Sequence, residues 1–282
     1  MFDHFLITRF NLRNPQWDFT KNKGSLLTDE WMEDRLELFE NFCFPSVIAQ
    51  KNKNFSWLLY LDETTTPKFK TRLEKLTANY PFIKLFFIDG MGAFQPSIKE
   101  HVSEHATKPY LITTRIDNDD CVHVDYIDAI QKSFNKQEYQ AIDIIKGFTL
   151  QIEPQFILGK KEHVFNPFIS LIERNVNPKT VWSNDHTAWK KETNIQQISD
   201  RRLWMSIIHE KNKVNEFDGY GKVDWNEISR TFIVSDAINA VITNKIIPFK
   251  EWQFKSFRNF MHVKLTLMSK VIKKSIGVYK VK

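Results

Sequence analysis

The chain has 282 residues, 42% of them hydrophobic, which is enough apolar material for one large domain. We find no apolar run of the length that spans a bilayer, and two cysteines, Cys43 and Cys121, exclude a disulfide framework and favour a reducing, cytoplasmic location. The net charge of +6 is uneven: residues 250–282 carry nine Lys or Arg and one acid, a net charge of +8, and residues 1–249 carry −2. The slightly acidic body argues against a nucleic-acid groove across the main fold.

The N-terminal half predicts an alternation of strands and helices. Short β-rich apolar runs indicate strands, and longer amphipathic runs indicate helices. Thr28 can cap the first helix, whose pattern continues to a break near Pro45. The predicted elements are strands at 4–10, 55–62, 82–89 and 110–117 and helices at 28–50 and 67–80. This order is typical of βαβ units and predicts an α/β fold with a doubly wound, Rossmann-like sheet.

The C-terminal half is less regular. The expected elements are strands at 143–152, 166–174 and 193–200, a helix at 200–212, a loop-rich stretch at 213–235 and a long helix from about Asp236 with an interruption near Pro248. Gly147 indicates a bulge in the first of these strands, and Ser199 or Asp200 can cap the helix that follows. We therefore predict one domain over residues 1–235 and a basic helical C-terminal extension over residues 236–282.

Three aspartates, Asp117, Asp119 and Asp120, lie within four positions at the end of a predicted buried strand. Like charges this close repel one another unless water, hydrogen bonds or a cation relieve them. A solvated turn would explain such a cluster in isolation, because Asp and Asn are common in turns. Mg²⁺ and Mn²⁺ also prefer carboxylate oxygens, and they often take only one or two from the protein. The cluster is therefore a candidate metal site.

Two other predicted strands also end in polar residues. Thr8 and Arg9 close the first strand, and Asp62 closes the second. In doubly wound sheets, ligands bind outside the carboxyl ends of the strands. We therefore expect these residues to share one edge of the sheet with the aspartate cluster, which favours a binding site there over a simple turn.

Four segments together resemble the rhamnosyltransferase family of bacterial glycosyltransferases, within the wider GT-A superfamily. They are "ITRFN", "RLELFENFCFPSVIAQKNKNFSWLLYLDETT", "YLITTRIDNDD" and "LWMSIIHEKN", and the resemblance covers roughly residues 4 to 215. It implies a GT-A-like fold with a mixed sheet and the transfer of a sugar from a nucleotide diphosphate donor. Rhamnose as that sugar follows from the family label alone.

The resemblance also implies roles for individual residues. Asp117 and Asp119 stand where the family's Asp-x-Asp stands, so they are the expected ligands of Mn²⁺ or Mg²⁺. His209, in "HEKN", is the expected further metal ligand, and His186 is the alternative. The expected contacts to the nucleotide sugar are Thr8, Arg9, Asp62, Arg115, Asp117 and Asn118. Strand alternation places Arg115 on the face of Asp117, where it contacts the nucleotide or pairs with an aspartate.

An inverting sugar transfer needs a carboxylate that takes the proton of the acceptor hydroxyl. Asp200 is one candidate, because many GT-A enzymes have an acid before an "LW"-like helix, although a helix cap would also explain an aspartate there. Asp185 is the other, in the polar loop "WSNDHTAW" between Trp182 and Trp189, whose rings could stack on an acceptor sugar. The sequence leaves both open, with a slight preference for Asp200.

The basic tail has two interpretations. Its apolar stripe either packs on the domain or binds an anionic membrane surface, which would suit a peripheral enzyme on the inner face of the membrane acting on a cell-surface glycan or lipid-linked acceptor. The stripe consists of Phe254, Phe257, Met261, Leu265, Met268, Val271 or Ile272, and Ile276. The alternative to a transferase is a non-catalytic glycan- or nucleic-acid-binding protein. Three carboxylates at its site disfavour a nucleic-acid partner, which binds Lys and Arg.

Overall fold

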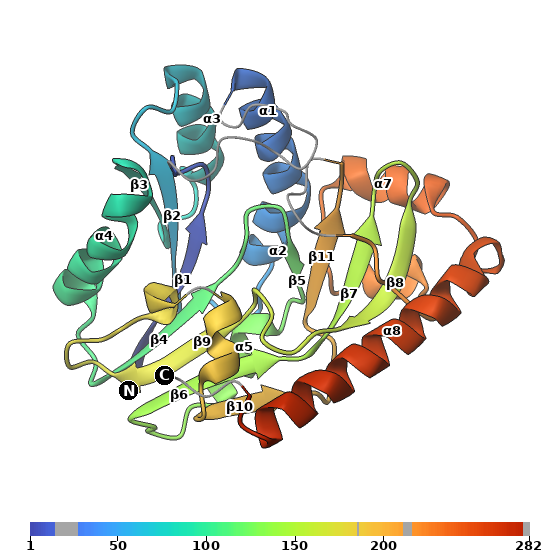
Figure 1. Cartoon of the computed structure of the whole chain (residues 1–282). Coiled ribbons are helices and arrows are strands. Elements are labelled where there is room, and N and C mark those ends of the chain that lie inside the picture. Colours follow the sequence, from blue (N-terminus) through green and yellow to red (C-terminus); the bar gives the residue numbers. More distant parts are fainter. Residues whose placement is uncertain (15–27, 185, 211–215, 279–282) are drawn as a thin grey trace.

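The computed structural model describes residues 1–14, 28–184, 186–210 and 216–278, and their strands form two sheets side by side (Figure 1). The larger sheet of this part of the chain is mixed and has the order β10 (Ile195–Ile198), β6 (Tyr139–Ile144), β9 (Ser170–Arg174), β4 (Tyr110–Arg115), β1 (Phe2–Arg9), β2 (Ser56–Asp62) and β3 (Ile83–Ile88). β1 pairs in parallel with β2 and β4, and β3 pairs in parallel with β2. β9 runs antiparallel between β4 and β6.

The smaller sheet has the order β5 (Cys121–Val122), β11 (Trp204–Ile208), β7 (Lys146–Gln151) and β8 (Ile157–Glu162). The chain passes from the large sheet to the small one at Ile145, so the prediction of one strand over 143–152 is wrong. Gly147 forms no bulge: it pairs regularly with Trp204. Its missing side chain leaves room for the Trp204 ring, because a Cβ on Gly147 would lie 2.2 Å from Trp204 Cδ2.

The predicted helix at 200–212 is also wrong, because β11 occupies the middle of this stretch. All five residues of β11 are buried, on both faces of the small sheet. The sequence therefore shows an apolar run without a one-sided pattern, and such a short run cannot be assigned to strand or helix by periodicity. Asp200 precedes the strand in a bend, so it does not cap a helix.

Helices cover both faces of the large sheet. They are α1 (Asp29–Leu38), a π-helical turn (Phe39–Cys43), α2 (Phe44–Ile48), α3 (Pro67–Thr77), α4 (Gly90–His105) and α5 (Tyr126–Lys132). Leu59 and Ile112 point into the core under α1, α2, α3 and α5, and Leu58 and Tyr60 point toward α4. Burial on both faces explains why the central strand "SWLLYLD" is almost continuously apolar.

The strands and helices predicted for the N-terminal half are largely confirmed. Thr28 caps α1, since the Trp31 backbone N donates to Thr28 Oγ1 at 3.2 Å. The helical stretch does not break near Pro45 but continues through the π-helical turn into α2. The sequence does not predict α4, α5, β5 or β8.

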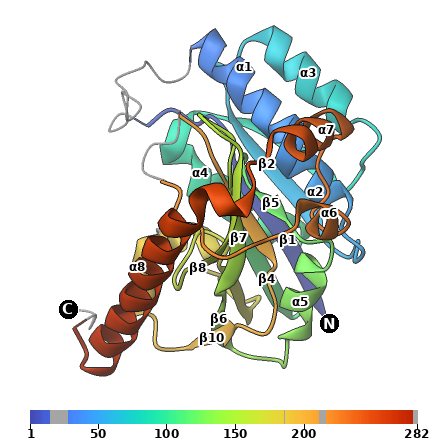
Figure 2. The same ribbon diagram turned by 90° about the vertical axis from the view of Figure 1, so that its right-hand side faces the viewer.

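The C-terminal segment forms α7 (Asp236–Lys245) and α8 (Phe249–Ser275), with the predicted interruption at Pro248. Figure 2 shows α8 on one side of the small sheet and α7, with the short α6 (Trp225–Ile228), on the other. The inner side of α8 is buried at Trp252, Ser256, Asn259 and Val263. The division of the chain near residue 235 stays a prediction.

The apolar stripe named above lies on the outer side of α8. Phe254 is 82% exposed and Leu265 is 55% exposed, and the whole stripe is exposed: Phe254, Phe257, Met261, Leu265, Met268, Val271, Ile272 and Ile276. No helix in the described ranges, α8 included, has the length and apolar character needed to pass through a bilayer.

Asp143, at the end of β6, gives the fold a specific pH dependence. Its carboxylate is fully buried and accepts hydrogen bonds from Phe165 N at 2.9 Å and Asn166 Nδ2 at 3.1 Å. Burial outweighs these bonds and the nearby Lys270 charge, and it raises the pKa of Asp143 to about 6. A proton on Asp143 therefore stabilises the folded state. This contribution is complete below the ordinary aspartate pKa and is lost as the pH rises through about 6.

We expect the free energy of unfolding of the wild type, minus that of Asp143→Asn, to fall by roughly 3 kcal/mol between about pH 4 and about pH 7. The amide cannot ionise, so the subtraction isolates this one group. Urea denaturation of both proteins across this range is the measurement. A constant difference would show that the Asp143 pKa is not raised.

Candidate functional site

The carboxyl ends of three parallel strands meet at one edge of the large sheet. β1 ends at Thr8 and Arg9, β2 ends at Asp62, and β4 leads directly into the aspartate cluster. The expectation that these residues share one edge is confirmed. The parallel register is the cause, because it carries the ends of neighbouring strands to the same side.

Asp119 is the centre of the cluster. Its Oδ2 accepts a hydrogen bond from Arg35 Nη1 at 2.6 Å and lies 3.2 Å from His209 Nε2. Burial alone would raise the pKa of Asp119, but the Arg35 charge and the His209 contact hold it well below its usual range. Asp119 is therefore an ionised carboxylate in a buried position. Arg35 of α1 contacts it from the helices over the large sheet, and His209 contacts it from the end of β11 in the small sheet.

Asp120 points toward the small sheet. Its Oδ1 accepts a hydrogen bond from the Ile207 backbone N at 3.1 Å. Burial, followed by the charges of Asp119 and Asp117, raises its pKa well above the usual value. Asp117 is half-buried. The repulsion expected from the sequence is therefore relieved in two ways: Arg35 balances Asp119, and the proton is held more tightly on Asp120.

Asp62 is held in a hydrogen-bond network. Its Oδ1 accepts from Arg13 Nε at 2.9 Å and from Thr64 Oγ1 at 2.6 Å, and its Oδ2 accepts from the Arg13 backbone N at 2.9 Å. Burial would raise the Asp62 pKa, but the bonds from Thr64 and Arg13 outweigh it and lower it. Asp62 is thus ionised, and it orders the segment after β1 at the edge where the cluster lies.

The predicted nucleotide-pocket residues of β1 and β4 point to different faces of the sheet. Thr8 is fully buried, and Trp57 Nε1 donates to its hydroxyl at 3.0 Å. Arg9 and Arg115 are on the opposite face, where their guanidinium carbons lie 5.5 Å and 3.9 Å from the centre of the Trp182 ring. Trp182 therefore forms a wall over both arginines.

Asn118 ties the cluster to β1 and α1. Its Nδ2 donates to the Phe10 carbonyl at 3.1 Å, and its Oδ1 accepts from Arg35 Nη1 at 3.3 Å. The structure thus gives Asn118 a clear part in positioning its neighbours Asp117 and Asp119.

The structure describes one of the two candidate bases, Asp200. Asp200 is exposed in the bend before β11, whereas His209 follows the other end of β11. A strand of this length separates its ends by about 13 Å, so Asp200 lies away from Asp119. Asp185, and the side chain of His186, lie outside the residues that the structure describes. Trp189 is fully buried and does not offer its ring to a ligand.

Sequence reasoning missed two arginines at this edge. Arg35 lies on α1 and Arg13 follows β1, and both pair with aspartates that were predicted: Asp119 and Asp62. Neither arginine belongs to a local motif. The only available signal was the need for positive charge near three aspartates, and it does not say which of 40 Lys and Arg supplies the charge.

The donor set at the cluster suits a hard divalent cation. Asp117 and Asp119 carry carboxylate oxygens that could bind such a cation, and His209 places an imidazole nitrogen 3.2 Å from Asp119 Oδ2. Among the described residues, no three His, Cys, Asp or Glu side chains gather into a group that could hold a metal ion by themselves. A cation that also binds diphosphate oxygens needs only one or two carboxylates from the protein, so these residues fit such an ion.

A family model described as "Putative rhamnosyl transferase" matches residues 3–219, more than three quarters of the chain. The chain belongs to this family. The resemblance inferred from the four sequence segments is confirmed. No curated protein matches the chain.

Solved structures are similar to the chain at low sequence identity. Staphylococcus aureus TarS 1–349 in complex with UDP-GlcNAc is 11% identical over 85% of this chain and 70% of that one, with a TM-score of 0.44. Mannosyltransferase PcManGT from Pyrobaculum calidifontis, in complex with GDP-Man and Mn²⁺, is 12% identical over 75% of this chain and 59% of that one, with a TM-score of 0.41. In another TarS 1–349 structure the match spans 60% of that chain. The predicted α/β class with a mixed sheet and a C-terminal helix is confirmed.

Proposed function

We propose that this rhamnosyl transferase family member moves a sugar, rhamnose by the family's name, from a nucleotide diphosphate to a hydroxyl of a glycan or lipid-linked acceptor, with inversion. The observation that carries the proposal is the ionised, buried Asp119 at the carboxyl edge of three parallel strands, with His209 Nε2 3.2 Å from its Oδ2. Such a donor agrees with the complex of TarS with UDP-GlcNAc and with the complex of PcManGT with GDP-Man and Mn²⁺.

Asp119, Asp117 and His209 would hold Mn²⁺ or Mg²⁺. Such a cation supplies positive charge to the leaving nucleotide diphosphate. Arg35 already donates to Asp119 and keeps its carboxylate ionised. Arg13 fixes Asp62 on the nucleoside side of the edge, and Trp182 covers Arg9 and Arg115 beside it. These side chains orient the donor, and none of them needs to change its protonation state.

Saturation-transfer NMR against a panel of nucleotide sugars tests this function. We expect at least one of the dTDP-, UDP- or GDP-sugars to bind, and Mn²⁺ to strengthen its binding. Failure of every donor to bind in the presence of Mn²⁺ would overturn the proposal. The non-catalytic alternative predicts the same failure, so this experiment also separates the two.

We also propose a cytoplasmic, peripheral position, with α8 on the anionic inner surface of the membrane. Two features support it: the exposed apolar side of α8 and the net charge of +8 over residues 250–282. Each basic residue close to an anionic surface contributes about 1 kcal/mol. An amphipathic helix of this kind lies in the interface and does not span it.

Sedimentation with phosphatidylglycerol vesicles tests the membrane contact. We expect the wild type to bind at low salt and to dissociate in about 1 M salt, where the Debye length shrinks to about 3 Å. The double variant Phe257→Gln, Leu265→Gln removes two exposed apolar side chains and should bind weakly. Val176→Gln, an exposed apolar position outside α8, is the control and should bind like the wild type.

Truncation before α8 is a poorer test, because Trp252 and Val263 are buried and their removal would expose the apolar surface that they cover. If the wild type ignores anionic vesicles, or if the double variant binds equally well, α8 is not the membrane contact.

A further inference from the structure

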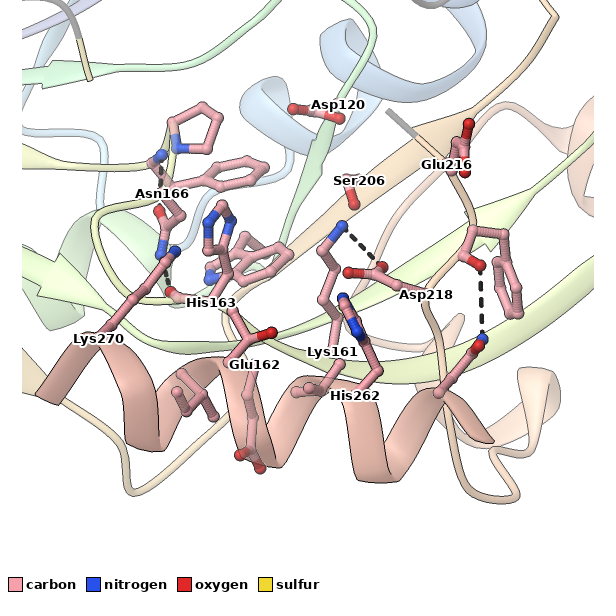
Figure 3. Close-up of a pocket in the computed structure, with 18 of the residues that line it drawn as sticks. Asp120, Lys161, Glu162, His163, Asn166, Ser206, Glu216, Asp218, His262 and Lys270 are labelled. Atoms are coloured by element: carbon pink, nitrogen blue, oxygen red, sulfur yellow. Dashed lines mark hydrogen bonds and ion pairs between the residues drawn. The ribbon is translucent and has the colours of Figure 1, made fainter. Parts of the chain in front are cut away.

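A cavity of about 570 Å³ lies between α8 and the small sheet (Figure 3). Its floor comes from Asp120 and from Ser206 of β11, and its opposite wall is the inner side of α8, from which His262 and Lys270 rise. This volume is in the range of sites for small ligands. No residue predicted from the sequence to contact donor or acceptor lines it.

Ser206 is the strongest sign that the cavity takes a ligand. Its side chain is 6% exposed, and its hydroxyl has no hydrogen-bond partner among the residues that the structure describes. Leaving a buried hydroxyl unpaired is unfavourable, whereas a ligand that reaches it restores the bond. Ser206 lines the cavity, so a ligand within it can supply the missing partner.

The charges around the cavity are largely balanced. Lys161 Nζ pairs with Asp218 Oδ1 at 2.8 Å, and Glu162 accepts from Lys264 Nζ at 2.6 Å and from Tyr220 Oη at 2.8 Å. A strongly charged ligand would have to compete with these pairs. Hydroxyl groups both donate and accept, so a hydroxyl-rich, neutral ligand can bond to carboxylates and ammonium groups without separating them.

α8 is held in place as a rigid wall. Asn259 Nδ2 donates to the Gly219 carbonyl at 3.0 Å, the Gly221 backbone N donates to Ser256 Oγ at 2.8 Å, and Lys264 reaches Glu162 from the outer side. These contacts connect the helix to β8 and to the strand-like segment beside it, which pairs Tyr220 with Lys160. The shape of the cavity is therefore built into the fold.

The cavity adjoins the aspartate cluster. Asp120, on its floor, directly follows Asp119, and Ser206 lies on β11, which ends directly before His209. At about 3.3 Å per residue, Ser206 lies about 10 Å along the strand from His209. Side chains alternate along a strand, so Ser206 and His209 face opposite ways, and Asp120 is the residue that joins the cavity to the cluster. A ligand in the cavity can present one hydroxyl past Asp120 toward a sugar held at the cluster.

We propose that this cavity is the acceptor subsite and that it binds the terminal sugars of a neutral, hydroxyl-rich glycan, with Ser206 as a specificity-determining hydrogen-bond partner. This proposal rests on the glycosyltransferase function proposed above. It adds a location and a ligand class that the family membership does not supply.

The test uses a substitution on α8 that fills the cavity with a large side chain. Thr266 is half-buried on α8 and lines the cavity, whereas Met268, two positions on, is 56% exposed on the outer side. Saturation-transfer NMR would use the methyl glycosides of rhamnose, glucose, galactose and N-acetylglucosamine, without vesicles. We expect at least one glycoside to bind the wild type and Met268→Trp equally, and to lose its signal with Thr266→Trp. Ser206→Ala should bind it about five-fold more weakly.

Binding of UDP, dTDP and GDP with Mn²⁺ is measured on the same proteins and should be equal in all of them. If no glycoside binds the wild type, or if Thr266→Trp binds as the wild type does, the cavity is not the acceptor subsite. If glycosides behave as expected but no nucleotide binds, the cavity stands as a glycan site and the proposed transferase chemistry falls.

Discussion

Asp119→Asn is expected to abolish Mn²⁺-dependent binding of the nucleotide diphosphate and to lower turnover by about 10³-fold or more. Asp119 is the buried, ionised carboxylate of the cluster, and its amide carries no charge for a cation. Stabilisation of a leaving phosphate by a metal contributes several kcal/mol, and each 1.36 kcal/mol changes the rate about tenfold. Calorimetric titration with UDP, dTDP and GDP, with and without Mn²⁺, gives the binding, and sugar transfer gives the rate.

Asp125→Asn is the matched control. Asp125 lies six residues further on, is half-buried, and pairs with Lys51 at 3.0 Å on the surface. It should bind the donor and turn over like the wild type. Circular dichroism of both variants checks that α1 stays folded when Arg35 loses its ion pair with residue 119. Full activity of Asp119→Asn, or of the wild type in excess EDTA, would refute the metal assignment.

Replacing the catalytic base is expected to lower kcat by about 10²–10⁴-fold and to leave donor affinity nearly unchanged, because the base does not touch the nucleotide. The structure changes the preference between the two candidates. Asp200 is exposed at the start of β11, about 13 Å of strand away from the end that reaches Asp119. Asp185 follows Trp182, whose ring covers Arg115. We therefore expect the loss in Asp185→Asn.

Asp200→Asn then serves as the control in the same assay, with turnover near that of the wild type. A large fall in Asp200→Asn alone would return the base to Asp200. If both variants turn over normally, neither aspartate is the base, and a retaining mechanism becomes the better proposal.

Much of the first half of the fold, though not α4, α5 or β5, was predictable from short β-rich apolar runs and from helices with one apolar side. The strand "SWLLYLD" is apolar on both faces, and the helix at Pro67–Thr77 shows apolar residues on one side only. The edge shared by Thr8, Asp62 and the cluster then followed from the topology, since parallel strands end on the same side. The prediction depended on chain direction and not on any side-chain contact.

The second half was harder because tertiary burial hides the period. β11 is covered on both faces, by α8 on one side and by α6 and α7 on the other, so its sequence shows no alternation. The contacts of the aspartate cluster were hard to predict for another reason, because they join residues far apart in the sequence. Arg35 reaches Asp119 across 84 positions of sequence, and His209 reaches it across 90, and no local pattern encodes either meeting.

Arg35 has a consequence for how the protein would respond to removal of the proposed cation. The positive charge that balances Asp119 belongs to the chain itself, at 2.6 Å, so folding does not have to wait for an ion to neutralise the cluster. In structural metal sites the binding energy is folding energy, and chelators unfold such proteins. Here the energy of cation binding and the energy of folding are separate. Chelation should therefore abolish activity and leave the melting temperature nearly unchanged. Activity should return when Mn²⁺ is added back. If the proposed cation binds here, the protein stays folded but inactive when that cation is scarce.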